Sequence, residues 1–227
     1  TKRIEVDMAG LVVDTAPTSE PLTLSDVKDY LRISGNSEDA LLTSFIKAVR
    51  IFCEDYTGRA LFTQTLILKL DTDRISEDPL WEGTKVGPYL NFYKNFISLP
   101  KPPLQTVTSL ITFDDADSGT TMASSRYYVD SAREPARVVL RTGETFPTAL
   151  RVANAIEVTY VAGYNSVANI PEPLKIGMLQ HIAYLYDQRG DMKDYQQTQS
   201  LPPMVAKLYQ PYKVMSGAGG SKYMALG

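Results

Sequence analysis

The spacing of hydrophobic residues changes along the 227-residue chain and divides it into regions of different periodicity. Near the N-terminus, Ile4, Val6 and Met8 alternate with charged residues, which is the two-residue period of a β-strand. A stretch rich in Pro and Ser at 16–21 follows and separates this arm from the rest of the chain. We therefore expect an extended N-terminal arm.

Two helices are predicted before residue 58. The first spans Leu22 to Ile33, with Ser25 as its N-cap and a face formed by Val27, Tyr30 and Leu31. The second follows Ser37 as its cap and stops at Gly58, a residue favoured just after a helix C-terminus. Its apolar positions recur every three or four residues over four turns: Leu41, Leu42, Phe45, Ile46, Val49, Phe52, Cys53 and Tyr56.

The middle of the chain has strand periodicity. Phe62, Gln64, Leu66, Leu68 and Leu70 alternate with residues of the opposite face. Similar runs occur at 96–99, 106–113, 126–130, 137–141 and 156–161, separated by Gly, Pro, Asp and Ser. We expect an antiparallel β region, and no element is assigned between 71 and 95.

Helical spacing returns after residue 170. Pro173 suits the first turn of a helix whose apolar stripe continues to Arg189, and Pro211 limits a last short helix. The helix, sheet, helix order predicts an α+β fold: a small bundle of about four helices with an inserted antiparallel β domain and extended N- and C-terminal arms. The expected divisions are an arm at 1–21, the bundle at 22–59 and 171–212, the β domain at 60–170 and a tail at 213–227.

Composition narrows the possible functions. The net charge of -3 argues against a chain that grips nucleic acid through its phosphates, so contact with DNA should be local or transient. One Cys and one His exclude an intramolecular disulfide and any site that needs two imidazoles. No apolar stretch approaches the roughly 20 residues of a membrane span, and we expect a soluble, cytosolically made protein without membrane contact.

The sequence offers few residues for catalysis. Cys53 occupies a core position of its helix, where a thiol is inert, and His181 beside an apolar stripe is expected to be satisfied or solvent-facing. Asp114, Asp115 and Asp117 suggest a calcium loop, but Gly119 and Arg126 fall where an EF-hand would not place them, so a solvated β-turn is predicted.

Two further kinds of site, a phosphate-binding loop and a catalytic pair of carboxylates, have no supporting motif in the sequence. Gly217, Gly220 and Lys222 do not have the spacing of a phosphate loop, and Tyr223 replaces its Ser or Thr. The 26 acidic residues contain no pair that stands out as a catalytic pair of carboxylates. We therefore predict no catalytic residue, no cofactor and no metal.

The C-terminal segment has the composition of a protein contact. Six of the 14 tyrosines lie between 184 and 227, and Tyr is favoured at interfaces. From Val205 onwards the charged residues are Lys207, Lys213 and Lys222, without any acidic residue. A locally basic, Gly-rich segment in an acidic protein is expected to fold onto a partner.

Several motifs, taken in order, resemble one known family. The sequence PLTLSDVKDYLRI precedes a helix that starts near Asp39 and leads through Glu54 to the turn Thr57, Gly58 and Arg59. LPKPPLQTVTSLITFDD, YYVD and a final block follow, the block containing Tyr160, Gly163, Tyr164, Pro171 and Arg189. From Leu22 to Arg189 the chain resembles the head-to-tail connector, or adaptor, proteins of tailed bacteriophages and gene transfer agents. The segment from 71 to 95 departs from that pattern.

The resemblance implies a structural virion protein, not an enzyme. Members of the family form a dodecameric ring beneath the portal, in the neck at the head-tail junction, where they extend the channel for packaged DNA and dock the stopper or tail-terminator protein. It implies assembly in the host cytoplasm. Alternatives are another neck or tail-completion protein, such as a stopper, and a hydrolytic enzyme that uses carboxylates.

Site residues follow as expectations. Because the C-terminal segment of several family members contacts the portal, the portal-binding residues expected here are Lys207, Tyr209, Tyr212, Lys213, Lys222, Tyr223, Met224 and Leu226. The alternating arm residues Ile4, Val6 and Met8 are expected to add a strand to a neighbouring subunit.

Overall fold

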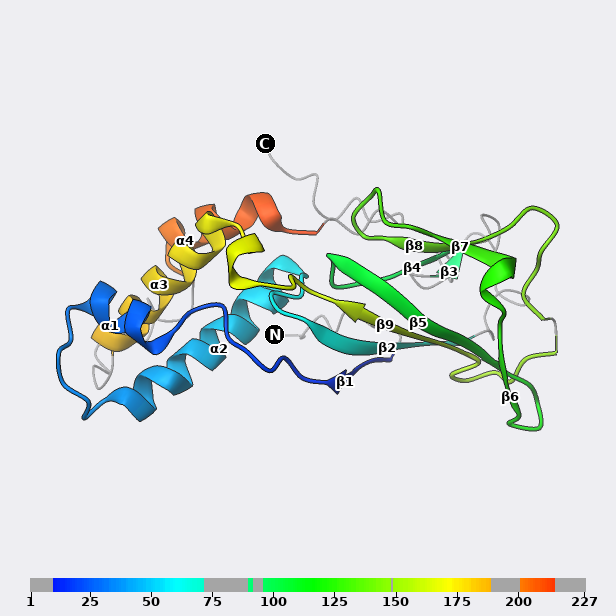
Figure 1. Ribbon diagram of the computed structural model, residues 1–227, viewed down its shortest axis with the longest axis horizontal. Helices are drawn as coiled ribbons and strands as arrows, with labels where there is room; N and C mark the ends of the chain where they lie inside the picture. Colours follow the sequence, from blue (N-terminus) through cyan, green and yellow to red (C-terminus); the bar gives the residue numbers. More distant parts are fainter. Residues whose placement is uncertain (1–9, 72–89, 92–95, 148, 189–200, 215–227) are drawn as a thin grey trace, which may run out of the picture. The chain divides into compact units, whose positions relative to one another are not determined.

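A computed structural model describes residues 10–71, 90–91, 96–147, 149–188 and 201–214, and it has an α+β fold as predicted (Figure 1). The chain divides into two compact units. Among the described residues, a β unit contains 10–16 and 64–163, and a helical unit contains 17–63 and 164–214. The helical unit is thus built from two segments that flank most of the β unit in the sequence.

Helix α1 (Leu24–Leu31) begins at a capping box. The Thr23 hydroxyl accepts a hydrogen bond from the Asp26 backbone N–H at 3.1 Å, and the Asp26 carboxylate accepts one from the Thr23 N–H at 2.9 Å. The hydrogen bond from the Thr23 side chain is the main reason that the pKa of Asp26 is lowered. The N-cap is therefore Thr23 and not the predicted Ser25, which would have lacked this reciprocal partner.

Helix α2 (Asp39–Thr57) matches the predicted span with two corrections. Its N-cap is Glu38, without a side-chain cap, instead of Ser37. The helix buries Leu42, Ile46, Val49 and Cys53, whereas Leu41 and Phe52 remain 38% and 42% exposed. One helix face can pack against only a limited width of core, so the broad apolar stripe extends past the buried surface.

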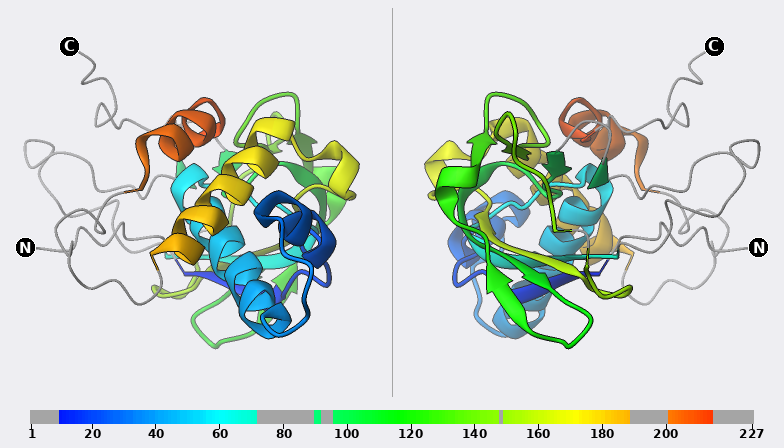
Figure 2. Two further views of the ribbon diagram at one scale, coloured as in Figure 1. Left: turned by 90° about the vertical axis from the view of Figure 1, so that its left-hand side faces the viewer. Right: turned by 90° about the vertical axis from the view of Figure 1, so that its right-hand side faces the viewer.

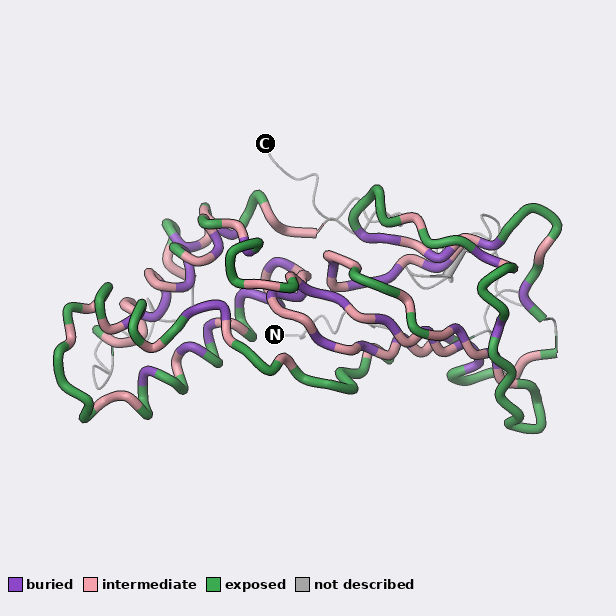
Figure 3. Tube along the Cα trace, viewed as in Figure 1, coloured by how far each residue is buried: buried purple, intermediate pink, exposed green. Residues whose placement is uncertain are grey.

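Helices α3 (Glu172–Asp187) and α4 (Pro203–Tyr209) complete the helical unit, and a 3-10 turn, Gln210–Tyr212, follows α4. The end-on view in Figure 2 shows α3 packed beside α2, with α4 against α3. The buried side chains form one cluster: Leu22, Val27, Leu42, Ile46, Val49, Cys53, Leu61, Ile170, Leu174, Met178, Ile182, Val205 and Tyr209. Figure 3 shows buried positions recurring between more exposed ones along the helices. No helix in the described part of the chain is long and apolar enough to cross a membrane.

The β unit contains a five-stranded sheet in the order β1-β2-β9-β5-β6. Its strands are β1 (Leu11–Thr15), β2 (Gln64–Leu70), β5 (Leu104–Phe113), β6 (Gly119–Thr121) and β9 (Ile156–Ala162). Strands β2 and β9 pair antiparallel along their whole length, and alternate residues of both are buried. The predicted alternation from Gln64 to Leu70 is confirmed.

A four-stranded sheet in the order β3-β4-β8-β7 belongs to the same unit. It contains β3 (Leu90–Asn91), β4 (Phe96–Ser98), β7 (Tyr127–Asp130) and β8 (Arg137–Leu140). Ile97, Val138 and Leu140 are buried on its inner side. The buried hydroxyl of Tyr160 in β9 donates to the carbonyl of Pro100, just after β4, at 2.8 Å. This bond ties the two sheets together within the β unit.

Strand β1 is the edge strand of the five-stranded sheet and pairs with β2. The described part of the N-terminal arm thus belongs to the β unit. The arm residues predicted to alternate, Ile4, Val6 and Met8, lie outside the described residues.

Candidate partner-binding site

The C-terminal segment is described as far as Val214. Lys207 is exposed on α4, while Tyr212 and Lys213 are half-buried. Tyr209 is fully buried in the helical unit, so in this structure it supports α4 from inside and offers no surface to a partner. The other expected portal-binding residues, Lys222, Tyr223, Met224 and Leu226, lie outside the described residues.

The turn after α2 is shaped by the last residues of that helix. Glu54 Oε1 accepts a hydrogen bond from the backbone N–H of Leu61 at 2.9 Å, and Thr57 Oγ1 donates to the carbonyl of Cys53 at 2.6 Å. Gly58 has a φ of +69°, in the left-handed region where glycine pays no steric penalty. The chain therefore reverses at Gly58, as predicted, and returns along the end of α2.

The C-terminal segment lies against this same turn. Arg59 Nε donates to the carbonyl of Tyr212 at 2.6 Å, and the backbone N–H of Val214 donates to the carbonyl of Thr57 at 2.7 Å. The Lys213 ammonium lies 5.1 Å from the centre of the Tyr56 ring, within the range of a cation–π contact. Residues 212–214 are thus held by three contacts to residues 56–59.

A charged triad stabilises α2 just before the turn. Arg50 Nε lies 2.7 Å from Glu20 Oε2, and Arg50 Nη1 lies 3.1 Å from Glu54 Oε2. Glu54 is only 5% exposed, and its carboxylate is accommodated because Arg50 and the Leu61 N–H both donate to it. The turn is therefore supported from within the helical unit.

Tyr209 connects α4 to the other helices. A Cβ placed on Gly177 of α3 would lie 2.5 Å from Tyr209 Cε1, so only glycine lets the ring approach this closely. The Tyr209 and Tyr56 ring centres are 5.9 Å apart. The Tyr209 hydroxyl lies near the Cys53 thiol without a hydrogen bond of standard geometry, and burial raises the pKa of the phenol.

Cys53 is a buried structural thiol, as predicted. It is fully buried, and this burial raises its pKa to about 12. A thiol with that pKa is almost entirely protonated at neutral pH and is a poor nucleophile. The side chain fills the core and has no surface from which to react.

His181 departs from its prediction. It is 7% exposed, packs edge-on against Phe52 with 4.9 Å between ring centres, and burial lowers its pKa. Its Nδ1 has no hydrogen-bond partner among the described residues. It is therefore not solvent-facing, because α3 buries it against Phe52 of α2, and its Nδ1 is left unpaired within the described part of the chain.

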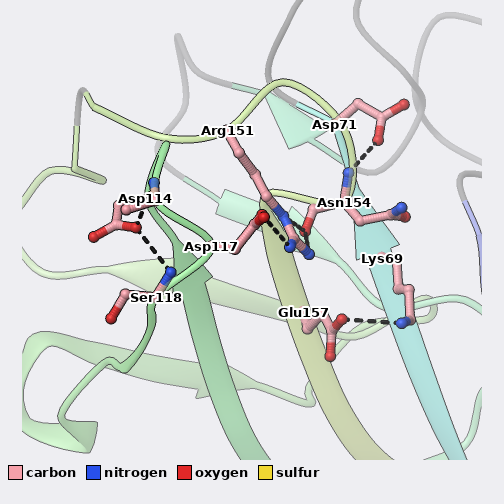
Figure 4. A network of polar contacts seen from close by, with 9 residues as sticks. Lys69, Asp71, Asp114, Asp117, Ser118, Arg151, Asn154 and Glu157 are labelled. Carbon is pink, nitrogen blue, oxygen red and sulfur yellow. Dashed lines mark hydrogen bonds and ion pairs between the residues drawn. The ribbon is translucent and has the colours of Figure 1, made fainter.

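The aspartates that suggested a calcium loop shape a turn between β5 and β6 (Figure 4). Asp114 Oδ1 accepts hydrogen bonds from the backbone N–H groups of Ala116 and Ser118, at 3.0 and 2.8 Å. Asp117 pairs with Arg151, with 3.1 Å between Oδ1 and Nη1. The predicted β-turn is confirmed, since β5 and β6 form a hairpin around it.

Arg151 is the centre of this polar network (Figure 4). Besides Asp117 it binds the carbonyl of Asn154, with its Nη2 at 2.8 Å, and its guanidinium lies 4.0 Å from the centre of the Phe113 ring. The Asn154 N–H donates to Asp71 at 2.7 Å. These groups close the loops at one end of the sheet. No group of three or more His, Cys, Asp or Glu side chains within the described ranges is arranged to hold a metal ion.

The sequence reasoning did not identify Arg59 as a site residue. Arg59 was noted as part of a Thr-Gly-Arg turn, but its partner, Tyr212, is 153 positions away. The signal available in the sequence is the turn itself, because a helix that ends at Gly leaves carbonyl groups without partners in the helix, and these can hold another segment of the chain.

The family comparison covers the part of the chain that contains this turn. The model of the phage gp6-like head-tail connector proteins matches residues 21–127, which include α1, α2 and the turn after it. These residues make up slightly less than half of the chain, and over them the chain is similar to that connector family. The chain matches no curated protein at a significant level.

The chain is also similar to chains in solved particles of gene transfer agents. A chain from the neck of an empty particle, computed with C6 symmetry, is 24% identical with a TM-score of 0.68, and the match covers 93% of this chain and 98% of that one. A chain from the neck of a native particle, computed with C12 symmetry, is 24% identical with a TM-score of 0.66 over the same shares. A chain from a native virion is 22% identical with a TM-score of 0.68, over 92% and 98%. The shared fold thus extends well beyond residue 127.

Proposed function

We propose that this chain is a head-tail connector of the adaptor type. It forms a ring in the neck beneath the portal, extends the DNA channel and docks the stopper or tail. The main support is the likeness over 93% of the chain to a chain from the neck of a gene transfer agent particle computed with C12 symmetry. A twelve-membered ring of this kind would close through a heterologous interface repeated by rotation.

The C-terminal segment provides the contact with the portal. Lys207 is exposed, and Lys213 is held at the end of α2, while no acidic residue follows Val205. Such a segment complements an acidic partner surface, and charge complementarity speeds and orients association. Lys222, Tyr223, Met224 and Leu226 continue this contact beyond the described residues.

The N-terminal arm provides a contact between subunits. Strand β1 is an edge strand, and the alternating residues Ile4, Val6 and Met8 precede it in the sequence. An extended segment of alternating residues can add a strand to the sheet of a neighbour. DNA in the channel makes only transient, non-specific contacts, in agreement with the net charge of -3.

The test is the composition of the neck. We expect native mass measurement of the full chain, mixed with portal rings from the same particle, to give twelve copies per portal. A chain ending at Val214 should keep its fold and lose portal attachment, and a chain lacking residues 1–9 should form weaker rings. A chain that never binds portals, or that joins the neck only after another ring protein, would refute the adaptor role, and the second result would favour a stopper.

A further inference from the structure

The C-terminal segment is held through its backbone. The carbonyl of Tyr212 accepts from Arg59 Nε at 2.6 Å, and the N–H of Val214 donates to the carbonyl of Thr57 at 2.7 Å. These two hydrogen bonds use main-chain groups of residues 212 and 214. They therefore fix the path of the chain, whatever side chains the segment carries.

The end of α2 is well suited to hold such a segment. The last carbonyl groups of a helix have no partner within the helix, and the Thr57 carbonyl is one of them. Gly58 turns the chain with a φ of +69°, and a Cβ added to it would lie 3.5 Å from Val214 Cβ. That distance is an ordinary van der Waals contact, so the positive φ favours glycine here, and the N–H of Val214 satisfies the carbonyl of Thr57.

Arg59 supplies the second bond from the adjacent position. A guanidinium is a charged donor, and a charged donor makes a stronger hydrogen bond than a neutral one. Between the two bonded residues, Lys213 lies over the Tyr56 ring. The anchor, defined here as Tyr56, Thr57, Gly58 and Arg59, thus holds both the path of residues 212–214 and the direction of one lysine.

We propose that this anchor positions the C-terminal segment for the portal, with Arg59 as the positioning residue. The proposal rests on the adaptor function proposed above. In a ring, every subunit must present its C-terminal segment at an equivalent place, and a fixed point of departure at Val214 provides this. Ordering the segment in advance also reduces the conformational cost that binding would otherwise carry.

A purely structural role for Arg59 makes a different prediction. If Arg59 only stabilised the helical unit, its loss would make the whole unit open more often and would leave the segment held whenever the unit is folded. If Arg59 positions the segment, its loss should release residues 210–214 while the rest of the helical unit remains closed. The two roles are separated by a local measurement on the folded chain.

The experiment compares three variants of the full chain. Arg59→Ala removes the donor, Arg59→Lys keeps a charged donor, and Lys47→Ala is the control because Lys47 is an exposed cation on α2, the helix that precedes the turn. Hydrogen exchange of a peptide covering 210–214 reports the anchor. Reactivity of the buried Cys53 thiol reports the integrity of the helical unit. Binding to immobilised portal rings from the same particle reports docking.

We expect Arg59→Ala to speed exchange at 210–214 by about tenfold, the effect of losing one charge-assisted hydrogen bond. Portal affinity should fall in proportion to the fraction of chains that still hold the segment, a fraction that the exchange data give directly, and so by at most about tenfold. Arg59→Lys should recover part of both losses. Lys47→Ala should match the wild type, and Cys53 should remain protected in all three variants.

Other results would overturn the inference. Unchanged exchange at 210–214 in Arg59→Ala would show that Arg59 does not hold the segment. Faster exchange with a portal affinity that does not follow the held fraction would show that the anchor has no part in docking, even if the chain ending at Val214 loses portal attachment and so supports the adaptor function. If that shortened chain still binds portals, the proposed role of the C-terminal segment fails, whatever Arg59→Ala does.

Discussion

Replacing Glu54 by Ala should destabilise the helical unit more than any surface substitution. Glu54 is 5% exposed, and its two carboxylate oxygens accept from the Leu61 N–H at 2.9 Å and from Arg50 Nη1 at 3.1 Å. The substitution removes both acceptors, and it leaves the buried Leu61 N–H without the carboxylate that it now binds. Arg50 keeps its bond to Glu20 at 2.7 Å, which limits the loss.

The magnitude follows from these two contacts. A buried donor left without a partner costs about 1–3 kcal/mol. Breaking a buried ion pair outright costs about 3–5 kcal/mol, and the remaining bond from Arg50 to Glu20 reduces that to the low end. Both costs describe the loss of the same carboxylate, so they are not summed, and the value at which the two ranges meet predicts that Glu54→Ala lowers the free energy of unfolding by about 3 kcal/mol. Glu54→Gln retains an oxygen for Leu61 and should cost about half as much.

Urea unfolding of the helical unit measures this difference. Cys53 is a suitable local probe, because its thiol becomes reactive when this unit opens. With a slope of about 2 kcal/mol per molar urea, a loss of 3 kcal/mol lowers the midpoint by about 1.5 M. The matched control is Glu172→Ala, whose carboxylate pairs at the surface with Lys175 at 2.6 Å and should contribute less than about 0.5 kcal/mol. Equal midpoints for Glu54→Ala and Glu172→Ala would refute the reasoning.

Three further predictions concern the interior of the helical unit. Gly177→Ala should lower the free energy of unfolding by about 0–2 kcal/mol, because overpacking against Tyr209 costs about 1–3 kcal/mol and the higher helix propensity of Ala recovers about 1 kcal/mol. The control Gly35→Ala, in an open loop, should leave the free energy of unfolding unchanged. Burial lowers the pKa of His181, so below about pH 6.5 the unfolded chain binds a proton that the folded chain does not. Stability should therefore fall between pH 7.5 and 5.5, and a His181→Leu variant with the same slope would contradict this. Cys53, with a pKa of about 12, should react with a thiol reagent at pH 8 only at the rate of unfolding, and rapid labelling of the native chain would show that the site is open.

Periodicity predicted the elements better than it predicted their ends. The alternation from Gln64 to Leu70 and the helical spacing after Glu38 are local properties, and both produced the expected elements. The N-cap of α1 shows why. Thr23 and Ser25 are both residue types that cap helices, and Thr23 is the cap because Asp26 lies three residues after it and returns a hydrogen bond. A cap is therefore decided by a reciprocal bond that residue type alone does not reveal.

The candidate site shows a different limit. The basic composition after Val205 is visible in the sequence and indicated a binding segment, yet Tyr209 in the middle of that segment is a core residue. Its burial depends on Gly177, which lies on another helix and contributes by having no side chain. The bond from Arg59 to Tyr212 likewise joins positions that only the folded chain brings together. Composition can therefore point to a candidate segment for partner binding, while the residues that hold this segment in place come from packing between distant parts of the chain.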